Sequence, residues 1–119
     1  MKNNHLAPAS LDEAAQFLAV SSRTVRRLID AGAMPCLRVG SALVVPVESL
    51  PGLRCAVDAS PDMRPLLRLH EAAARLECSP RALRDLTRSG ELNSVFVGCS
   101  ERWVPADIDA FEMTGAHDA

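Results

Sequence analysis

One stretch of the sequence occurs twice, and this repetition constrains the fold more than any other feature. Residues 21–32 read SSRTVRRLIDAG, and residues 79–90 read SPRALRDLTRSG. An offset of 58 positions aligns their first serines, two arginines and their final glycines. In a chain of 119 residues, such a repeat predicts two copies of one supersecondary unit. Units of roughly 50 residues lie near the lower limit for independent folding, so we expect them to rely on each other, on a partner chain or on a ligand.

The repeated stretch predicts a short helix with one basic side. Ser21 can accept a hydrogen bond from a free backbone N–H at the start of the helix, and Gly32 can adopt the left-handed conformation that ends it. Apolar residues at i, i+3 and i+4 predict one buried face. They are Val25, Leu28 and Ile29, while Arg23, Thr24, Arg26 and Arg27 fall elsewhere on the helix. A helix that exposes several arginines near its start is suited to the major groove of DNA.

A further helix is predicted before the repeated stretch in each copy. In the first copy, Ser10 and Glu13 form a capping box, and the helix is predicted to run to about Ala19. A short turn then separates the two helices, as a helix–turn–helix motif requires. In the second copy, Glu71 matches Glu13, but Arg68 stands in the place of Ser10. Because this copy lacks the capping side chain, we expect its first helix to fray or to start differently.

After each repeated stretch, the helical periodicity gives way to the pattern of a β-hairpin followed by a helix. In the first copy, the predicted strands are residues 36–39 and 42–45, and the short helix is residues 47–50. In the second copy, the predicted strands are residues 92–97 and 101–104, and the helix is residues 105–113. One extra residue is assigned to the second hairpin, and Trp103 is expected in the core at its base.

These elements predict a mainly α fold with small β-hairpin wings, arranged as two tandem winged helix–turn–helix units. The predicted organisation is a flexible arm (1–9), a first unit (10–50), a linker (51–65), a second unit (66–113) and a tail (114–119). Three prolines in the linker predict a fairly stiff connector.

Charge and cysteine content narrow the class of protein. The formal net charge of −2 argues mildly against nucleic-acid binding, but twelve of the thirteen basic residues are arginines, which can form paired hydrogen bonds with phosphate or guanine. The four cysteines form no C-x-x-C pair, so we expect reduced thiols in an intracellular protein. No signal peptide is visible, and no apolar run approaches the roughly 20 residues that span a membrane. We therefore expect a cytoplasmic, nucleoid-associated protein.

At these residues the chain resembles the excisionase-type branch of the MerR-like winged helix–turn–helix superfamily. The resemblance rests on an ordered set of short motifs that covers both copies. They are LDEAA (11–15), SSRTVRRLI (21–29), RVG (38–40), HEAA (70–73), SPRALR (79–84), VG (97–98) and RWVPADI (102–108). The resemblance implies a small bacterial or phage protein that binds double-stranded DNA, either as a transcription regulator or as a recombination directionality factor.

The resemblance also implies which residues contact DNA: the second helix of each unit in the major groove, and each hairpin wing at the backbone or minor groove. In the first unit these positions are Ser22, Arg23, Thr24, Arg26, Arg27, Arg38, Gly40 and Ser41. In the second unit they are Arg81, Arg84, Arg88, Gly98, Ser100 and Arg102. Two features depart from the family pattern. The first wing lacks the usual basic residue, and Asp85 replaces Arg27, where a carboxylate would repel phosphate or accept a hydrogen bond from cytosine.

Three functions remain open from the sequence. The first is a transcription regulator that reads double-stranded DNA with two heads, and the second is an excisionase. The third is a protein-interaction adaptor that has lost DNA binding, which the net charge, the neutral first wing and Asp85 favour. Besides DNA, the expected partners are a second copy of the chain or a recombinase or toxin, and no membrane. No convincing catalytic set is apparent, so we expect no enzymatic activity, no metal and no cofactor.

Overall fold

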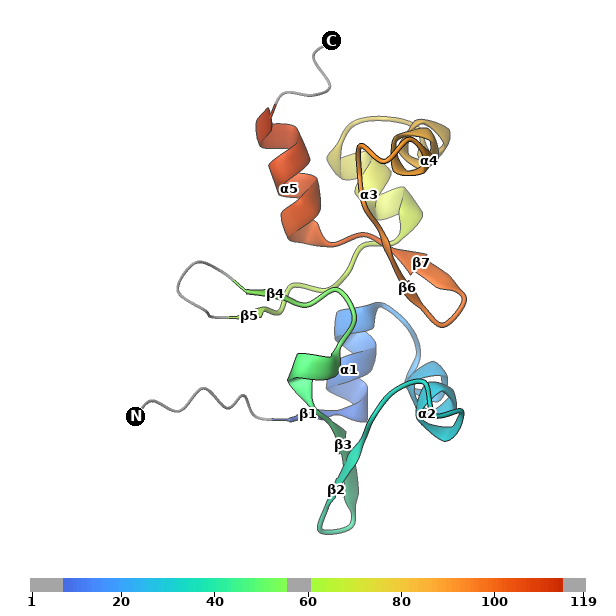
Figure 1. The fold of residues 1–119 in the computed structure, drawn as a ribbon, viewed down its shortest axis with the longest axis vertical. Coiled ribbons are helices and arrows are strands. Elements are labelled where there is room, and N and C mark those ends of the chain that lie inside the picture. The colour runs from blue at the N-terminus through green and yellow to red at the C-terminus, as the bar shows by residue number, and fades with distance from the viewer. Residues whose placement is uncertain (1–7, 56–60, 115–119) are drawn as a thin grey trace, which may run out of the picture.

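The computed structural model describes residues 8–55 and 61–114, in which two similar units are stacked along the longest axis of the molecule (Figure 1). The remaining parts of the predicted arm, linker and tail, at residues 1–7, 56–60 and 115–119, lie outside the described residues. No described helix is long and apolar enough to cross a membrane.

The N-terminal unit (residues 8–50) combines two helices with a three-stranded antiparallel sheet. Its elements are β1 (Ala9–Ser10), α1 (Leu11–Leu18), α2 (Ser22–Asp30), β2 (Leu37–Val39), β3 (Ala42–Val45) and the 3-10 helix η1 (Val47–Ser49). The strand order is β1-β3-β2. The predicted flexible arm (1–9) is wrong at its last residue, Ala9, which belongs to strand β1. Ala9 pairs with Val45 and is buried, because its backbone extends the sheet and its small side chain fits into the core.

The C-terminal unit (residues 66–114) has the same order of elements, with a longer final helix. Its elements are α3 (Leu69–Arg75), α4 (Pro80–Arg88), β6 (Val95–Val97), β7 (Ser100–Arg102) and α5 (Pro105–Thr114). No side chain caps the start of α3, as the missing serine predicts. The helix nevertheless begins at Leu69, the equivalent of Leu11 in α1, so the expectation of a different start is wrong. The backbone N–H of Arg68 still donates to the Glu71 carboxylate at 2.8 Å, so half of the capping box is retained.

The strands of the two units pair in the same register, offset by 58 positions. The corresponding pairs are Leu37–Val44 with Val95–Arg102, and Ala9–Val45 with Leu67–Trp103. Since this offset holds throughout both hairpins, the extra residue of the C-terminal unit lies after its hairpin, between Trp103 and Pro105. The sequence-based assignment of that residue to the hairpin itself is therefore wrong.

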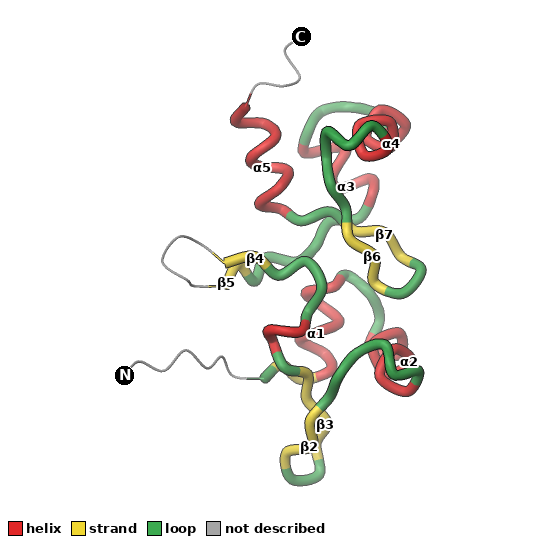
Figure 2. The backbone as a smooth tube through the Cα atoms, in the orientation of Figure 1, coloured by secondary structure: helices red, strands yellow, loops and turns green. Residues whose placement is uncertain are grey.

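Part of the predicted linker is a short antiparallel hairpin, not a simple proline-stiffened connector. Strand β4 (Arg54–Cys55) pairs with β5 (Pro61–Asp62), and the pair lies on the side of the molecule opposite α2 and α4 (Figure 2). Arg64 joins this hairpin to α5, because its guanidinium donates to Asp62 at 2.8 Å and to Asp109 at 2.9 Å. The hydrogen bond from Arg64 lowers the pKa of Asp62 below its ordinary value.

The apolar core of the N-terminal unit extends across the boundary between the units. The core around Leu18 and Val25 of the N-terminal unit also contains Leu66, Val97 and Val104, which belong to the C-terminal unit. The second core surrounds Trp103, Leu83 and Ile108. Trp103 is 1 % exposed, which confirms its predicted place in the core. With five α-helices and small antiparallel sheets in the described residues, the fold is mixed rather than mainly α.

Candidate nucleic-acid interface

The turn between α1 and α2 fixes the direction of the second helix. Helix α1 ends at Leu18, and the next residue, Ala19, caps it with a left-handed backbone at a φ of 59°. Ser21 then caps α2, because its hydroxyl accepts a hydrogen bond from the backbone N–H of Thr24 at 3.1 Å. Val25 is completely buried beneath the helix. The cap and the buried valine together hold one side of α2 against the core and leave the other side to solvent.

The solvent side of α2 carries three arginines, as predicted. Arg23, Arg26 and Arg27 are all exposed, and none forms an ion pair with a described residue. Unpaired guanidinium groups on a fixed helix retain all five N–H donors for an outside acceptor. Phosphate oxygens and the O6 and N7 atoms of guanine are acceptors of the required geometry.

Two polar residues that are predicted to contact DNA also have partners within the motif. The Ser22 hydroxyl donates to the Asp12 carboxylate at 2.6 Å and so connects α2 to the start of α1. The Thr24 hydroxyl lies 3.0 Å from the Ser21 hydroxyl. Both side chains thus stabilise the orientation of the helix that presents the arginines.

The first hairpin extends from the end of the molecule and is open to solvent. Arg38, Gly40 and Ser41 are all exposed at its first strand and turn, where the sequence placed a wing contact. Sequence reasoning missed the apolar character of this strand: Leu37 is 50 % exposed and Val39 is 58 % exposed. These two side chains alternate with Arg38 along β2, which forms one edge of the sheet.

Helix α4 presents a second basic surface, but carboxylates lie beside it. Arg81, Arg84 and Arg88 are exposed on this helix. Arg88 pairs with Asp85 at 3.3 Å, and Arg84 and Arg88 line a polar pocket of about 140 Å³ together with Glu101 of the second hairpin. The carboxylates reduce the positive potential that α4 offers to a phosphate, in contrast to the unpaired face of α2.

The second hairpin is packed against the N-terminal unit, so part of the predicted wing surface is not available to DNA. Arg102 does not point outward. Its Nε donates to the carbonyl oxygen of Leu18 at 3.2 Å, and its Nη2 donates to that of Ala19 at 2.8 Å. Burial in this contact lowers the pKa of Arg102 from its ordinary value. Ser100 is half-buried on the same strand. The structure thus places Arg102 in the contact between the units and not on the exposed wing where the sequence placed it.

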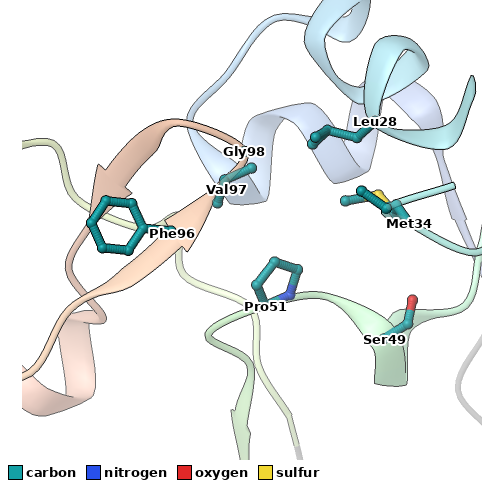
Figure 3. A pocket seen from close by; sticks show the side chains of 8 residues that line it. Leu28, Met34, Ser49, Pro51, Phe96, Val97 and Gly98 are labelled. Atoms are coloured by element: carbon teal, nitrogen blue, oxygen red, sulfur yellow. The ribbon is translucent and has the colours of Figure 1, made fainter. Parts of the chain in front are cut away.

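A groove of about 310 Å³ marks this contact on the surface. Val97 and Gly98 of the second hairpin line one side, and Leu28 and Met34 of the N-terminal unit line the other (Figure 3). Val97 is buried, and Gly98 lies so close to α2 that an added Cβ atom would be 3.2 Å from the Leu28 side chain. Sequence reasoning missed this contact, since residues about 70 positions apart form it and no local pattern marks them.

Residues 10–50 match the family model described as a helix-turn-helix domain. The matched segment covers α1, α2 and the first hairpin, which are the elements that carry the unpaired arginine face. No curated protein and no solved structure matches the chain. The match and the geometry of α1 and α2 agree that residues 10–50 form a helix-turn-helix domain.

Proposed function

We propose that the chain is a sequence-specific double-stranded DNA-binding protein with two reading heads, and that it acts as a bacterial or phage transcription regulator. The observation that carries the proposal is the exposed, unpaired arginine face of α2 within a helix-turn-helix domain. In this proposal α2 enters the major groove, and Arg23 and Arg26 bind guanine edges and phosphates. The first hairpin contacts the adjacent phosphate backbone of the DNA through Arg38 and the N–H groups of its turn.

The common register of the two units supports a second reading head. In this proposal α4 is the recognition helix of the second unit, equivalent to α2 in the first. Ser79 caps its start, and Pro80 lies in its first turn. Arg81 and Arg84 then correspond to Arg23 and Arg26 at the same offset of 58 residues. A second head on the same chain raises the local concentration of binding surface at the DNA, so two weak half-sites can act as one strong site.

An excision factor is the alternative within the same class. Both roles need a small protein that reads DNA, but an excision factor bends DNA and cooperates with a recombinase. A circular-permutation assay, which measures how strongly the protein bends its DNA site, distinguishes the two roles. The neighbouring genes also distinguish them. A strong bend with an adjacent recombinase gene favours excision. A divergent promoter or an adjacent toxin gene favours transcription regulation. In either role we propose a cytoplasmic protein without enzymatic activity.

A protein-interaction role is a further candidate for the C-terminal unit. The specific observations are the pairing of Arg88 with Asp85 and the presence of Glu101 in the pocket that Arg84 also lines. Both carboxylates weaken the attraction of this unit for phosphate. In this version the N-terminal unit binds DNA and the C-terminal unit binds a partner protein or a second copy of the chain. This version would be favoured if a chain carrying both Arg81→Ala and Arg84→Ala kept its affinity for DNA and still captured a partner.

The test of the proposal is selection of bound DNA from a random pool, followed by mobility-shift titration on the selected site. We expect a defined half-site, and we expect affinity to fall steeply with salt because phosphate contacts release counterions. Combining Arg23→Ala with Arg26→Ala should weaken binding by roughly 2–6 kcal/mol, since each base-reading arginine contributes about 1–3 kcal/mol. The exposed helix residue Gln16 supplies the control, and Gln16→Ala should leave affinity unchanged. Undiminished binding by the double arginine variant would exclude α2 as the recognition helix.

A further inference from the structure

The end of α1 is the place where the two units are joined most closely. The last carbonyl groups of an α-helix have no partner within the helix. At α1, residues of the C-terminal unit satisfy three successive carbonyls, those of Phe17, Leu18 and Ala19. Leu66 N donates to Phe17 O at 2.7 Å, Arg102 donates to Leu18 O and Ala19 O, and Arg68 Nη2 donates to Ala19 O at 3.2 Å. We refer to these contacts as the inter-unit clamp.

Beside the clamp, an apolar contact also holds the second hairpin against the N-terminal unit. Val97 of the second hairpin is 1 % exposed and belongs to the same core as Val25 of α2. Gly98 lies against Leu28 on the opposite side of that helix from the solvent-facing arginines. Hydrogen bonds at α1 and packing at α2 together hold the second hairpin against both helices of the reading motif.

The residues that form the clamp have no equivalents one repeat earlier in the chain. At the offset of 58 residues, Val44 corresponds to Arg102 and Pro8 corresponds to Leu66. A valine side chain has no N–H donor, and a proline has no backbone N–H. The first hairpin of another copy therefore cannot dock on α3 as the second hairpin docks on α1, so the arrangement closes within one chain.

The orientation of the units is head-to-tail. In Figure 1, the hairpins β2–β3 and β6–β7 point in the same direction along the long axis, and α2 and α4 lie on the same side of it. A two-fold axis between units stacked along that direction would be perpendicular to it, and would make the two hairpins point in opposite directions. The units are thus related mainly by translation along the molecule.

We propose that the inter-unit clamp, with Arg102 as its main positioning residue, makes the chain a reader of directly repeated half-sites at one fixed spacing. The proposal rests on the proposed two-headed DNA binding. Heads related by translation meet two half-sites in the same orientation, whereas heads related by a two-fold axis meet a palindrome. With both recognition helices on one side, the favoured spacing is about one helical turn, or roughly 10 bp. Arg102 acts through the position of the second head and does not touch DNA.

The DNA experiment uses duplexes with two selected half-sites in direct or inverted orientation, with the spacing increased in single base-pair steps. The full chain should bind the best direct repeat roughly 100-fold more tightly than the same repeat extended by about 5 bp, which places the second half-site on the opposite face. Combining Arg102→Ala with Arg68→Ala should reduce this ratio to about 3-fold, while affinity for a single half-site changes less than about 2-fold. Cys99→Ser, on the exposed turn of the same hairpin, is the control and should keep the ratio. Preference for inverted repeats, or a spacing ratio that survives loss of both arginines, would overturn the proposal.

A second measurement tests the clamp without DNA. Trp103 is the only tryptophan, so its fluorescence follows the C-terminal unit, while far-UV circular dichroism follows helices of both units. Urea transitions by the two probes should coincide in the unaltered chain and separate in the Arg102→Ala, Arg68→Ala variant. Coincident transitions in the variant would show that the arginines do not join the units. If the chain binds no DNA, the proposed function and the direct-repeat preference both fail, while this measurement still decides whether the clamp exists. Arg102→Lys, which keeps a charge and a donor, provides a milder variant in case the alanine variant does not fold.

Discussion

The turn glycines Gly40 and Gly98 have the same backbone conformation in different surroundings. Both have a φ of 64°, in the left-handed region that side chains with a Cβ atom disfavour. At Gly40 an added Cβ would have nothing within 4 Å, whereas at Gly98 it would lie 3.2 Å from Leu28 Cδ2. The pair therefore separates the cost of backbone strain from the value of packing between the units.

We expect Gly98→Ala to lower the free energy of unfolding more than Gly40→Ala does. Strain alone should cost roughly 1–2 kcal/mol at both positions. The excess at Gly98 arises because the Leu28 side chain has to move or the hairpin has to shift. Urea denaturation of the two variants measures the difference. Equal losses would show that Leu28 gives way freely and that the hairpin is not held tightly against α2.

At the scale of single elements, the chain obeys local rules that can be read from its sequence. In α1, the Ser10 hydroxyl accepts from the Glu13 N–H at 3.0 Å, and the Glu13 carboxylate accepts from the Ser10 N–H at 2.9 Å. The helices, their caps and the two hairpins were predictable because neighbouring residues determine them. The exposed arginines of α2 were predictable for the same reason, since the apolar stripe fixes which side of the helix faces the core.

Strand β1 and the role of Arg102 were not predictable, because segments distant in the sequence determine them. Ala9 enters the sheet only through β3, and Arg102 finds its acceptors on α1, more than 80 positions earlier. In the sequence alone, Arg102 has the same appearance as any arginine at the end of a hairpin strand. Only the packing of one unit on the other assigns it to the clamp.

The capping box of α1 has a measurable value of its own. Ser10→Ala should lower the free energy of unfolding by about 1 kcal/mol, because the Glu13 N–H loses its acceptor. Glu13→Ala should also destabilise the chain, and the two changes should not be additive since the residues cap each other. Gln16→Ala, at an exposed position of the same helix, is the control and should have little effect. Additive losses in the urea midpoints would show that the two hydrogen bonds act independently.

For the whole molecule, charge is distributed unequally between the units. Residues 8–50 carry four arginines and four carboxylates, whereas residues 66–114 carry six arginines and eight carboxylates. The C-terminal unit also places Glu101 near its recognition face. If the two units contact one duplex through the clamped arrangement, the N-terminal unit should supply most of the attraction.

Equivalent arginines on the two helices should therefore contribute unequally to DNA affinity. Arg26 and Arg84 match at the offset of 58 residues, and both are exposed. We expect Arg26→Ala to weaken binding to the direct repeat by about 1–3 kcal/mol, and Arg84→Ala to weaken it by less, because Glu101 already offsets part of the charge of Arg84. Titrations at several salt concentrations measure both effects, and the loss of a phosphate contact should reduce the salt slope by about 1. An Arg84→Ala loss as large as that of Arg26→Ala would mean that the two heads share the DNA equally, and that the carboxylates beside α4 turn away from the duplex when the complex forms.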